Sequence, residues 1–412
     1  MVVLYNFLIL ILRAGFRIAS LFHPKAKAFV KGRKGVFKRM EKVFGNSQLP
    51  VAWIHCASLG EFEQARPLIE ALKKEYPDLK ILLTFFSPSG YEVRKNYDKA
   101  DLVVYLPWDT ASNASKFVAI AKPTLAVFVK YEYWFHYTDV LKKKNVRILS
   151  ISSIFRRNQL FFKSYGGFYR NILKNFSHFF VQNDVSLRLL RSIGIQNSSL
   201  AGDTRFDRVY EIVNRGEEIP IAHKFKNGQN TFVIGSCWPE DFEVLAPLIN
   251  QNSTKFIIAP HEITEDFIHG VENSLMVKCV RYSQAQNTNH LEDYQVLIID
   301  NIGMLSRLYR YGEFAFVGGA FGKGLHNILE AACYGVPIFF GNKNYEKFQE
   351  ATDLINRGGA FEVKDYTDFK SKYEMMNIPE NFLLACEVTK LYVVENLGAT
   401  EKIMRYCRTL LK

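Results

Sequence analysis

The chain has few cysteines, and none of them is placed like a metal ligand or a disulfide partner. Its 412 residues contain six: Cys56, Cys237, Cys279, Cys333, Cys386 and Cys407. No two form a Cys-x-x-Cys pair, and no histidine accompanies them at ligand spacing. This pattern argues against a structural zinc site and predicts reduced thiols in the cytosol.

The chain also lacks an uninterrupted apolar run long enough for a comfortable membrane span. Val2–Leu12 is almost entirely apolar, but Arg13 and Arg17 interrupt it before the roughly 20 residues that a spanning helix needs. We therefore expect a short, tilted or in-plane anchor, with a buried first helix as the alternative. The positive charge follows the apolar stretch, which disfavours a cleaved secretory signal and predicts that everything after Arg13 is cytoplasmic.

No nucleic-acid-binding motif accompanies the excess of positive charge. The formal net charge is +12, and Lys25–Lys42 holds eight Lys or Arg residues against one acid, Glu41. A basic segment directly after an apolar one favours anionic lipid over nucleic acid as a partner. The sequence thus predicts that Lys25–Lys42 docks the protein on a membrane surface.

Short apolar runs recur along the rest of the chain in two series. The first comprises Val51–His55, Ile81–Phe86, Leu102–Leu106, Leu125–Val129, Val146–Ile151 and Phe179–Val181. The second comprises Thr231–Ile234, Phe256–Ala259, Val277–Val280, Val296–Ile299, Phe314–Val317 and Pro337–Phe340. Helix-like stretches such as Phe62–Tyr76 separate several of them, which predicts parallel sheets covered by helices on both faces.

A polar, charged stretch at 209–230 separates the two series, and 412 residues exceed what one hydrophobic core usually serves. We therefore predict an α/β fold of two Rossmann-like domains facing a cleft. The predicted parts are an anchor and basic linker (1–45), an N-terminal domain (46–215), a linker (216–228) and a C-terminal domain (229–412). The helical stretch Asn381–Leu411 is expected to pack across the surface or to cross back.

A glycine-rich turn follows the run Phe314–Val317 and precedes the helix-like run Ile328–Tyr334. It begins with Gly318–Gly319, and Glu330 falls one turn into the helix that follows. Glycines allow close approach of the backbone to a ligand, and unpaired N–H groups at a helix start favour phosphate or carboxylate. The pattern predicts a nucleotide-binding site in which Glu330 holds ribose hydroxyls. An ordinary strand-to-helix turn of an α/β fold has the same sequence pattern and is the alternative.

Glu61 follows the first predicted strand, in the sequence Ala57–Glu61, and lies in the first turn of a predicted helix. The carboxyl ends of strands bind ligands in α/β folds, so this carboxylate can act as a general base on an attacking hydroxyl. A helix-start glutamate favoured by the dipole is the alternative.

Two further groups follow strands of the first half. Glu132 lies among aromatic residues in Lys130–Trp134, where it can orient a sugar or stabilise positive charge, or else belong to a packing corner. Arg205, in Gly202–Arg208, is placed to offer a cation to a leaving phosphate, unless this is a solvated basic loop.

In the second half, Ala259–Glu262 and Asp300–Met304 each come directly after a strand. Backbone groups at such strand ends often frame a base and a ribose. His261 alone is weak evidence for acid–base chemistry, since the chain has nine histidines.

These motifs together resemble the Kdo transferase family, membrane-associated enzymes that move 3-deoxy-D-manno-octulosonic acid (Kdo) from CMP-Kdo to a lipid A precursor. The resemblance extends to about residue 365. The family's Ser-x-Gly-Glu matches Ser58–Glu61, and its glutamate before a Trp matches Glu132. Its Gly-Asn-x-Lys-Phe-Asp matches Gly202–Asp207 with two substitutions, and its paired glycines with Gly-x-His-Asn-x-x-Glu match Gly318–Gly319 and Gly324–Glu330.

The resemblance implies a GT-B glycosyltransferase that inverts the anomeric carbon, requires no metal or cofactor, and acts in lipopolysaccharide biosynthesis at the inner membrane. It implies that Glu61 is the general base and that Glu132 and Arg205 stabilise the transition state. The implied CMP-sugar contacts are Pro260, His261, Ile302, Gly303, Met304, Gly318, Gly319, His326, Asn327, Ile328, Leu329 and Glu330.

Some positions depart from the family pattern. Pro260–Glu262 stands where the family usually has Pro-Arg-His, so a cationic phosphate contact must be missing or come from elsewhere. Arg205 replaces the usual Lys, and Met304 replaces a usual Glu. Transfer of another activated sugar to a different glycolipid, and a non-catalytic membrane-docking protein, remain the alternative functions.

Overall fold

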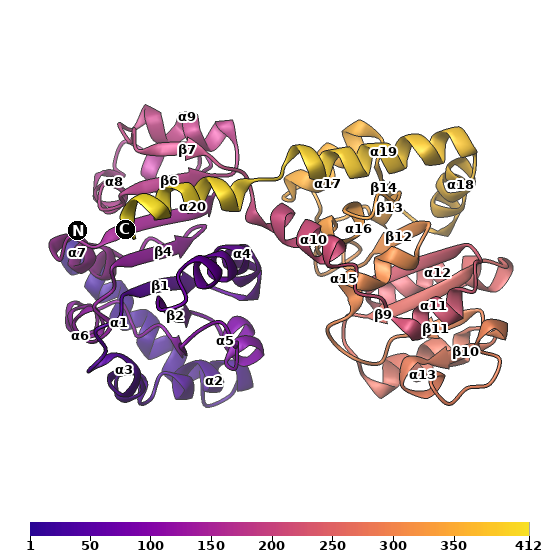
Figure 1. Ribbon diagram of the computed structural model, residues 1–412, viewed down its shortest axis with the longest axis horizontal. Coiled ribbons are helices and arrows are strands. Elements are labelled where there is room, and N and C mark those ends of the chain that lie inside the picture. The colour runs from indigo at the N-terminus through magenta and orange to yellow at the C-terminus, as the bar shows by residue number, and fades with distance from the viewer. Residues whose placement is uncertain (412) are drawn as a thin grey trace. The chain divides into compact units, whose positions relative to one another are not determined.

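The computed structural model describes residues 1–411 and divides the chain into two compact units. Unit 1 comprises Met1–Arg208 together with the chain from Leu397 onward, and unit 2 comprises Val209–Asn396. Each unit contains one seven-stranded sheet with helices around it (Figure 1). The α/β fold with two Rossmann-like domains is therefore confirmed.

All strand pairs of unit 1 are parallel, in the order β3-β2-β1-β4-β5-β6-β7. The strands are β1 (Val51–Cys56), β2 (Lys80–Phe85), β3 (Leu102–Tyr105), β4 (Leu125–Val129), β5 (Arg147–Ser153), β6 (His178–Val181) and β7 (Ser198–Leu200). Every residue of β1 and β4 is buried, as expected where helices cover both faces of a parallel sheet.

The helices before and between these strands complete unit 1. They are α1 (Val2–Ala19), α2 (Pro24–Gly32), α3 (Val36–Phe44), α4 (Leu59–Glu75), α5 (Pro88–Arg94), α6 (Ala111–Ala121), α7 (Phe135–Lys143), α8 (Gly167–Leu173) and α9 (Asp184–Ser192), with a 3₁₀ turn at Leu160–Phe162. Helix α10 (Thr204–Arg215) begins in unit 1 and ends in unit 2, because the boundary falls after Arg208. Alternate residues of the strands supply two cores. Trp53 and Phe128 belong to one core, and Ile54 and Val127 to the other.

Unit 2 repeats the plan in the order β10-β11-β9-β8-β12-β13-β14, again all parallel. Its strands are β8 (Thr231–Cys237), β9 (Lys255–Pro260), β10 (Cys279–Arg281), β11 (Val296–Ile298), β12 (Phe314–Val317), β13 (Ile338–Gly341) and β14 (Ala360–Val363). Its helices are α11 (Pro220–Lys226), α12 (Pro239–Gln251), α13 (Glu265–Ser274), α14 (Tyr282–Ala285), α15 (Leu305–Leu308), α16 (Leu329–Ala332), α17 (Gln349–Arg357), α18 (Tyr366–Met376) and α19 (Pro379–Glu395), with 3₁₀ turns at Leu291–Asp293 and Tyr309–Tyr311.

The first 45 residues differ from the predicted anchor and linker. The basic segment is not a linker, because α2 and α3 pack on the domain and bury Phe29, Val36, Met40 and Phe44. These apolar positions recur three or four residues apart between the lysines, so each helix has a buried face and a charged face.

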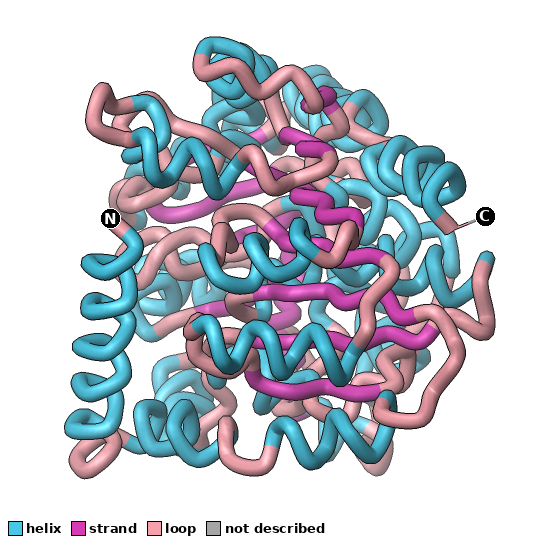
Figure 2. The backbone as a smooth tube through the Cα atoms, turned by 90° about the vertical axis from the view of Figure 1, so that its left-hand side faces the viewer, coloured by secondary structure: helices cyan, strands magenta, loops and turns pink. Residues whose placement is uncertain are grey.

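Helix α1 lies along unit 1 and is held near both of its ends. The Tyr5 hydroxyl donates to Asp109 over 2.5 Å, and Phe16 stacks on Phe29 with ring centroids 4.0 Å apart. Figure 2 shows this helix running down one edge of the unit from the labelled N-terminus. By length and composition alone it could cross a membrane, yet only 6% of it is buried. Its opposite face is therefore apolar and uncovered.

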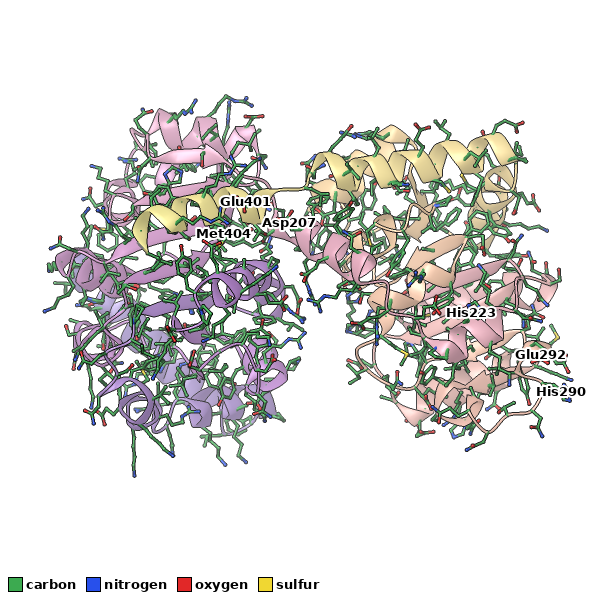
Figure 3. All side chains as sticks on the ribbon, viewed as in Figure 1. Asp207, His223, His290, Glu292, Glu401 and Met404 are labelled. Carbon is green, nitrogen blue, oxygen red and sulfur yellow. The ribbon has the colours of Figure 1, made fainter. Side chains whose placement is uncertain are left out.

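The boundary between the units also differs from the predicted one. Residues 216–228 are not an extended linker, because α11 packs into unit 2 through Ala222 and Phe225. The last helix, α20 (Ala399–Leu410), belongs to unit 1, where the N–H groups of Gly398 and Thr400 donate to Asp207. Figure 3 shows Asp207 next to Glu401 and Met404, which line the same 480 Å³ pocket.

Candidate active site

The order of strands reverses direction at one place in each sheet. In unit 1 the chain runs outward from β1 through β2 to β3 and then returns to β4 beside β1. In unit 2 it returns to β12 beside β8. Open α/β sheets bind ligands at the carboxyl ends of the strands next to such a switch point. The segments Ser58–Glu61, Lys130–Trp134 and Gly318–Gly319 all lie at these two places.

Glu61 lies in the first turn of α4, three residues after the N-cap Ser58. This spacing is that of a capping box, in which both side chains would bond to the helix backbone. Ser58 makes no such cap bond, and its hydroxyl instead donates to the Glu61 carboxylate. Glu61 and Ser58 therefore do not form a capping box, and the Glu61 carboxylate is bonded to the Ser58 hydroxyl instead.

Glu132 is held by two N–H donors. Its Oε2 lies 2.8 Å from Trp134 Nε1 and 3.1 Å from Nε2 of His55, a residue with no solvent exposure. The aromatic sequence around Glu132 suggested a sugar site or a packing corner, but His55 carried no signal, because it lies within an apolar strand.

The charges of Glu61 and Glu132 both act on Cys56, the last residue of β1. Burial raises the pKa of the Cys56 thiol well above its usual value, and both carboxylates add to the rise. Burial likewise raises the pKa of the Tyr131 hydroxyl, with a contribution from Glu61. The structure thus places both predicted carboxylates near the carboxyl end of β1, at the switch point of unit 1.

Arg205 is engaged by a neighbouring carboxylate. Its Nη2 and Nε each lie 2.9 Å from Oδ2 of the buried Asp203, which also accepts a bond from Gln64. Burial alone would raise the pKa of Asp203, but the Arg205 cation lowers it overall. Arg205 is therefore a cation of unit 1 whose orientation is fixed by its ion pair with Asp203.

In unit 2, the paired glycines are required by their surroundings. A Cβ at Gly318 would lie 2.3 Å from the Ser236 carbonyl oxygen and 2.4 Å from Asp241 Oδ2. Gly319 has φ of +96°, and a Cβ there would lie 2.9 Å from the His326 ring. The helix that follows, α16, is only one turn long. This loop therefore allows a ligand to approach the backbone closely, but it does not offer the dipole of a long helix.

Three rings stack beside the glycine loop. The centroid of His261 lies 4.4 Å from that of Trp238 and 4.2 Å from that of His326. Trp238 Nε1 donates to His326 Nε2 over 3.0 Å, which leaves the proton of the neutral imidazole on Nδ1. Burial, with a contribution from His261, lowers the pKa of His326 to about 4, so this ring is uncharged near neutral pH. Sequence reasoning missed Trp238, which lies in a helix-start loop.

A buried carboxylate ties the glycine loop to the start of α12. Asp241 Oδ2 accepts the N–H of Trp238 over 2.9 Å and that of Gly319 over 2.8 Å. Its Oδ1 has no hydrogen-bond partner within residues 1–411. Burial raises the pKa of Asp241 to about 6, despite the two N–H bonds.

Two lysines lie against the same loop. The Lys347 ammonium would be 3.2 Å from a Cβ at Gly324, and the Lys323 ammonium lies 5.8 Å from the centroid of the Trp238 ring. The segment that lacks the family's usual arginine, Pro260–Glu262, is close to this loop, because its His261 stacks on His326.

The remaining predicted contacts also follow strands of this edge. Asn327 bonds to Glu330 over 3.1 Å, and its Oδ1 accepts the N–H of Leu329. Ile302 is almost fully exposed, after β11. Across residues 1–411 we find no group of three or more His, Cys, Asp or Glu side chains placed to hold a metal ion.

Comparison with known proteins now adds to this geometry. Residues 31–208 match the family described as 3-deoxy-D-manno-octulosonic-acid transferase (kdotransferase). The resemblance to the Kdo transferase family is confirmed. The chain is 28% identical to a 3-deoxy-D-manno-octulosonic acid transferase of Rickettsia felis over 80% of its own length and 72% of that protein. It is 26% identical to the Kdo transferase of Aquifex aeolicus, over 78% and 84%.

Solved structures support the fold beyond the residues that match the family. A UDP-GlcNAc 2-epimerase from Neisseria meningitidis has a TM-score of 0.61 at 14% identity, over 88% of this chain and 100% of that one. MurG from Acinetobacter baumannii has a TM-score of 0.54 at 11% identity, over 88% and 99%. The fold is thus of the GT-B type that was expected from the resemblance to Kdo transferases.

Proposed function

We propose that this protein transfers Kdo from CMP-Kdo to a lipid A precursor, lipid IVA, with inversion at the anomeric carbon. Similarity to Kdo transferases supports a glycosyltransferase that handles Kdo. The observation that carries the finer proposal is the placement of Glu61, whose carboxylate does not form a capping box and lies, like that of Glu132, at the switch point of unit 1.

In the proposed step, Glu61 takes the proton of the acceptor hydroxyl while that oxygen bonds to the anomeric carbon of Kdo. The bond from this carbon to the phosphate oxygen breaks, and CMP leaves with the electron pair. The sugar gains positive character and the phosphate gains negative charge, so Glu132 and a cation act at opposite ends. Arg205 is the proposed cation of unit 1, and Asp203 keeps it oriented.

The donor seat is proposed in unit 2. CMP-Kdo carries a phosphodiester and the carboxylate of the sugar acid, so it needs positive charge from the protein. Lys323 and Lys347 supply it beside a loop whose glycines permit close approach. The neutral ring of His326 adds no charge but offers an Nδ1–H donor.

The proposed site of action is the cytoplasmic face of the inner membrane, with α1 in the membrane plane. Contacts at Tyr5 and Phe16 hold this helix along unit 1, while exposed side chains such as Val3 and Phe7 remain for lipid. In the basic segment, Arg33 donates to the carbonyl oxygens of Phe29, Phe86 and Leu106. Arg39 donates to the Tyr91 hydroxyl and the Gly32 carbonyl oxygen. The other six basic residues are exposed and remain for an anionic surface: Lys25, Lys27, Lys31, Lys34, Lys38 and Lys42.

Thermal melting with nucleotides tests the donor. A bound ligand stabilises the folded state by about 2.7 kcal/mol at 100 times its Kd. We expect CMP to raise the melting temperature and UDP to leave it unchanged. Protection by UDP alone would point instead to another nucleotide sugar. Vesicle binding without protection by any nucleotide would point to a non-catalytic docking protein.

Vesicle flotation tests the membrane surface. Replacing Lys25, Lys27, Lys31 and Lys34 by Gln should weaken binding to anionic vesicles by about 1 kcal/mol per residue and reduce its salt dependence. The matched control replaces four exposed lysines of unit 2, Lys224, Lys364, Lys370 and Lys390. Equal binding by both quadruple variants would contradict the role of the basic segment.

A further inference from the structure

A chain of buried polar side chains leads from the core of unit 1 to Glu132. Trp53 Nε1 donates to Thr84 Oγ1 over 2.8 Å, and Thr84 Oγ1 lies 2.9 Å from His55 Nδ1. His55 Nε2 then lies 3.1 Å from Glu132 Oε2. Trp53, His55 and Thr84 have no solvent exposure. None of these three has a role in the proposed reaction.

The sheet places these groups together. Trp53 and His55 are two residues apart in β1 and so point to the same face. Thr84 is paired with His55 across the parallel β1–β2 ladder. Burying polar groups destabilises a protein unless each is hydrogen-bonded, and an apolar trio would fill the same space without that requirement. The arrangement therefore calls for a reason other than packing.

The hydrogen bonds fix where the protons lie. An ionised carboxylate only accepts, so His55 Nε2 must carry the proton that faces Glu132. The Trp53 indole only donates, so Thr84 accepts from it. The Thr84 proton then goes to the unprotonated Nδ1 at 2.9 Å, in preference to the Ile54 carbonyl oxygen at 3.4 Å. Trp134 Nε1 also approaches His55 Nε2, at 3.3 Å, but both atoms are then donors that converge on Glu132 Oε2.

We infer that His55 is a positioning residue for Glu132, and that Thr84 and Trp53 fix the imidazole tautomer that this role requires. The inference rests on the proposed function and goes beyond it. Two N–H donors hold Oε2, so the carboxylate keeps one orientation, while Oε1 remains available to the sugar. His55 itself touches no substrate and acts through Glu132.

Two substitutions at His55 separate this role from packing. In His55→Gln the side-chain amide can reach the place of Nε2 and keep a donor on Glu132. In His55→Asn the shorter amide reaches only the place of Nδ1, so the donor is lost. We expect His55→Asn to lower kcat for Kdo transfer by about 100-fold, the effect of a small misplacement of a reacting group. KM for the donor should change little, and His55→Gln should recover most of the rate.

A double-mutant cycle gives the decisive result. If His55 acts through Glu132, then adding His55→Asn to Glu132→Gln should change kcat less than threefold, although it lowers kcat about 100-fold in the wild type. Independent, multiplying effects would overturn the inference, as would equal rates for His55→Asn and wild type. Wild-type protein that transfers no Kdo would overturn the proposed function itself, and this inference with it.

Thr84→Val keeps the experiment informative if His55→Asn does not fold. Valine nearly matches the volume of threonine but cannot bond to Nδ1, so the ring loses the partner that fixes its tautomer. We expect kcat to fall about tenfold, with circular dichroism and CMP protection retained. An unchanged kcat in folded Thr84→Val would also contradict the inference.

Discussion

Unit 1 and unit 2 place their candidate residues at the same point of similar sheets, yet the chemistry differs. At the switch point of unit 1 lie two carboxylates, Glu61 and Glu132, with a paired arginine nearby. At that of unit 2 lie paired glycines, a neutral histidine and two lysines, Lys323 and Lys347. On the proposed function, the topology sets where a ligand would bind, and the loop residues set whether protons or anions would be handled there.

The largest expected effect separates the proton chemistry of unit 1 from the binding chemistry of unit 2. Glu61→Gln removes the general base and keeps the size of the side chain. Transfer should fall about 100-fold to 10,000-fold, the range for such catalysis. Protection of the folded protein by CMP should persist, because the donor seat is untouched. Near-normal turnover in this variant would remove Glu61 from its role.

The converse change is Gly319→Ala in unit 2. A Cβ there would lie 2.5 Å from the Gly324 carbonyl oxygen at a φ of +96°, so the glycine loop must shift. We expect destabilisation by about 1–3 kcal/mol and loss of CMP protection in thermal melts. Gly358→Ala is the matched control, because Gly358 also has positive φ but open space around it. Loss of CMP protection in both variants would show that strain alone is responsible.

Lys347→Ala sharpens the assignment of anion binding. A lost hydrogen bond from a charged group is worth about 1.5–3 kcal/mol, so affinity for CMP-Kdo should fall roughly 10-fold to 100-fold. Lys347→Arg should retain most of it. Lys370→Ala, an exposed lysine of α18, serves as the control. Unchanged affinity in Lys347→Ala, measured by calorimetry, would contradict the role of this cation.

Asp241→Asn tests the electrostatics of unit 2. The folded state raises the pKa of Asp241 from its usual value near 4 to about 6. The proton is thus held more tightly in the folded state, which adds stability at low pH that is lost as the pH rises through 6. The difference amounts to about 2 kcal/mol between pH 4 and pH 7. Asp241→Asn should flatten this part of the stability profile, whereas parallel profiles would contradict the shift.

The smallest effect is expected at Gly60, next to Glu61. A Cβ at Gly60 would meet only the Ser58 hydroxyl, at 3.8 Å, so the fold does not require glycine there. We expect Gly60→Ala to stabilise the protein by up to about 1 kcal/mol but to raise KM for the acceptor several-fold. Gly270→Ala, in open space within α13, should stabilise without changing KM. An unchanged KM in Gly60→Ala would show that the acceptor does not occupy the space next to Gly60.

Much of the fold could be predicted from apolar runs. β4 and β12 begin and end as predicted, because each is apolar throughout. β7, the short polar run Ser198–Leu200, was missed because it lies at a sheet edge. The basic segment looked like a linker because its buried positions are spaced for a helix and so never form a run.

Site residues could be predicted where they belong to a local sequence motif. They could not be predicted where strand pairing brings distant residues together. Glu61 and Gly318–Gly319 stand in motifs, so sequence alone pointed to them. His55 and Thr84 meet only because β1 and β2 pair in one register. Lys347 reaches the glycine loop from the segment after β13, so its place depends on the packing of unit 2.

The most direct test of the account is Kdo transfer by the wild-type protein. CMP-Kdo, generated in place, is offered with a tetraacylated lipid A precursor in detergent, and the lipid is weighed by mass spectrometry. The account predicts a lipid heavier by one or more Kdo units. An unchanged lipid, in a preparation that CMP still protects from melting, would contradict it.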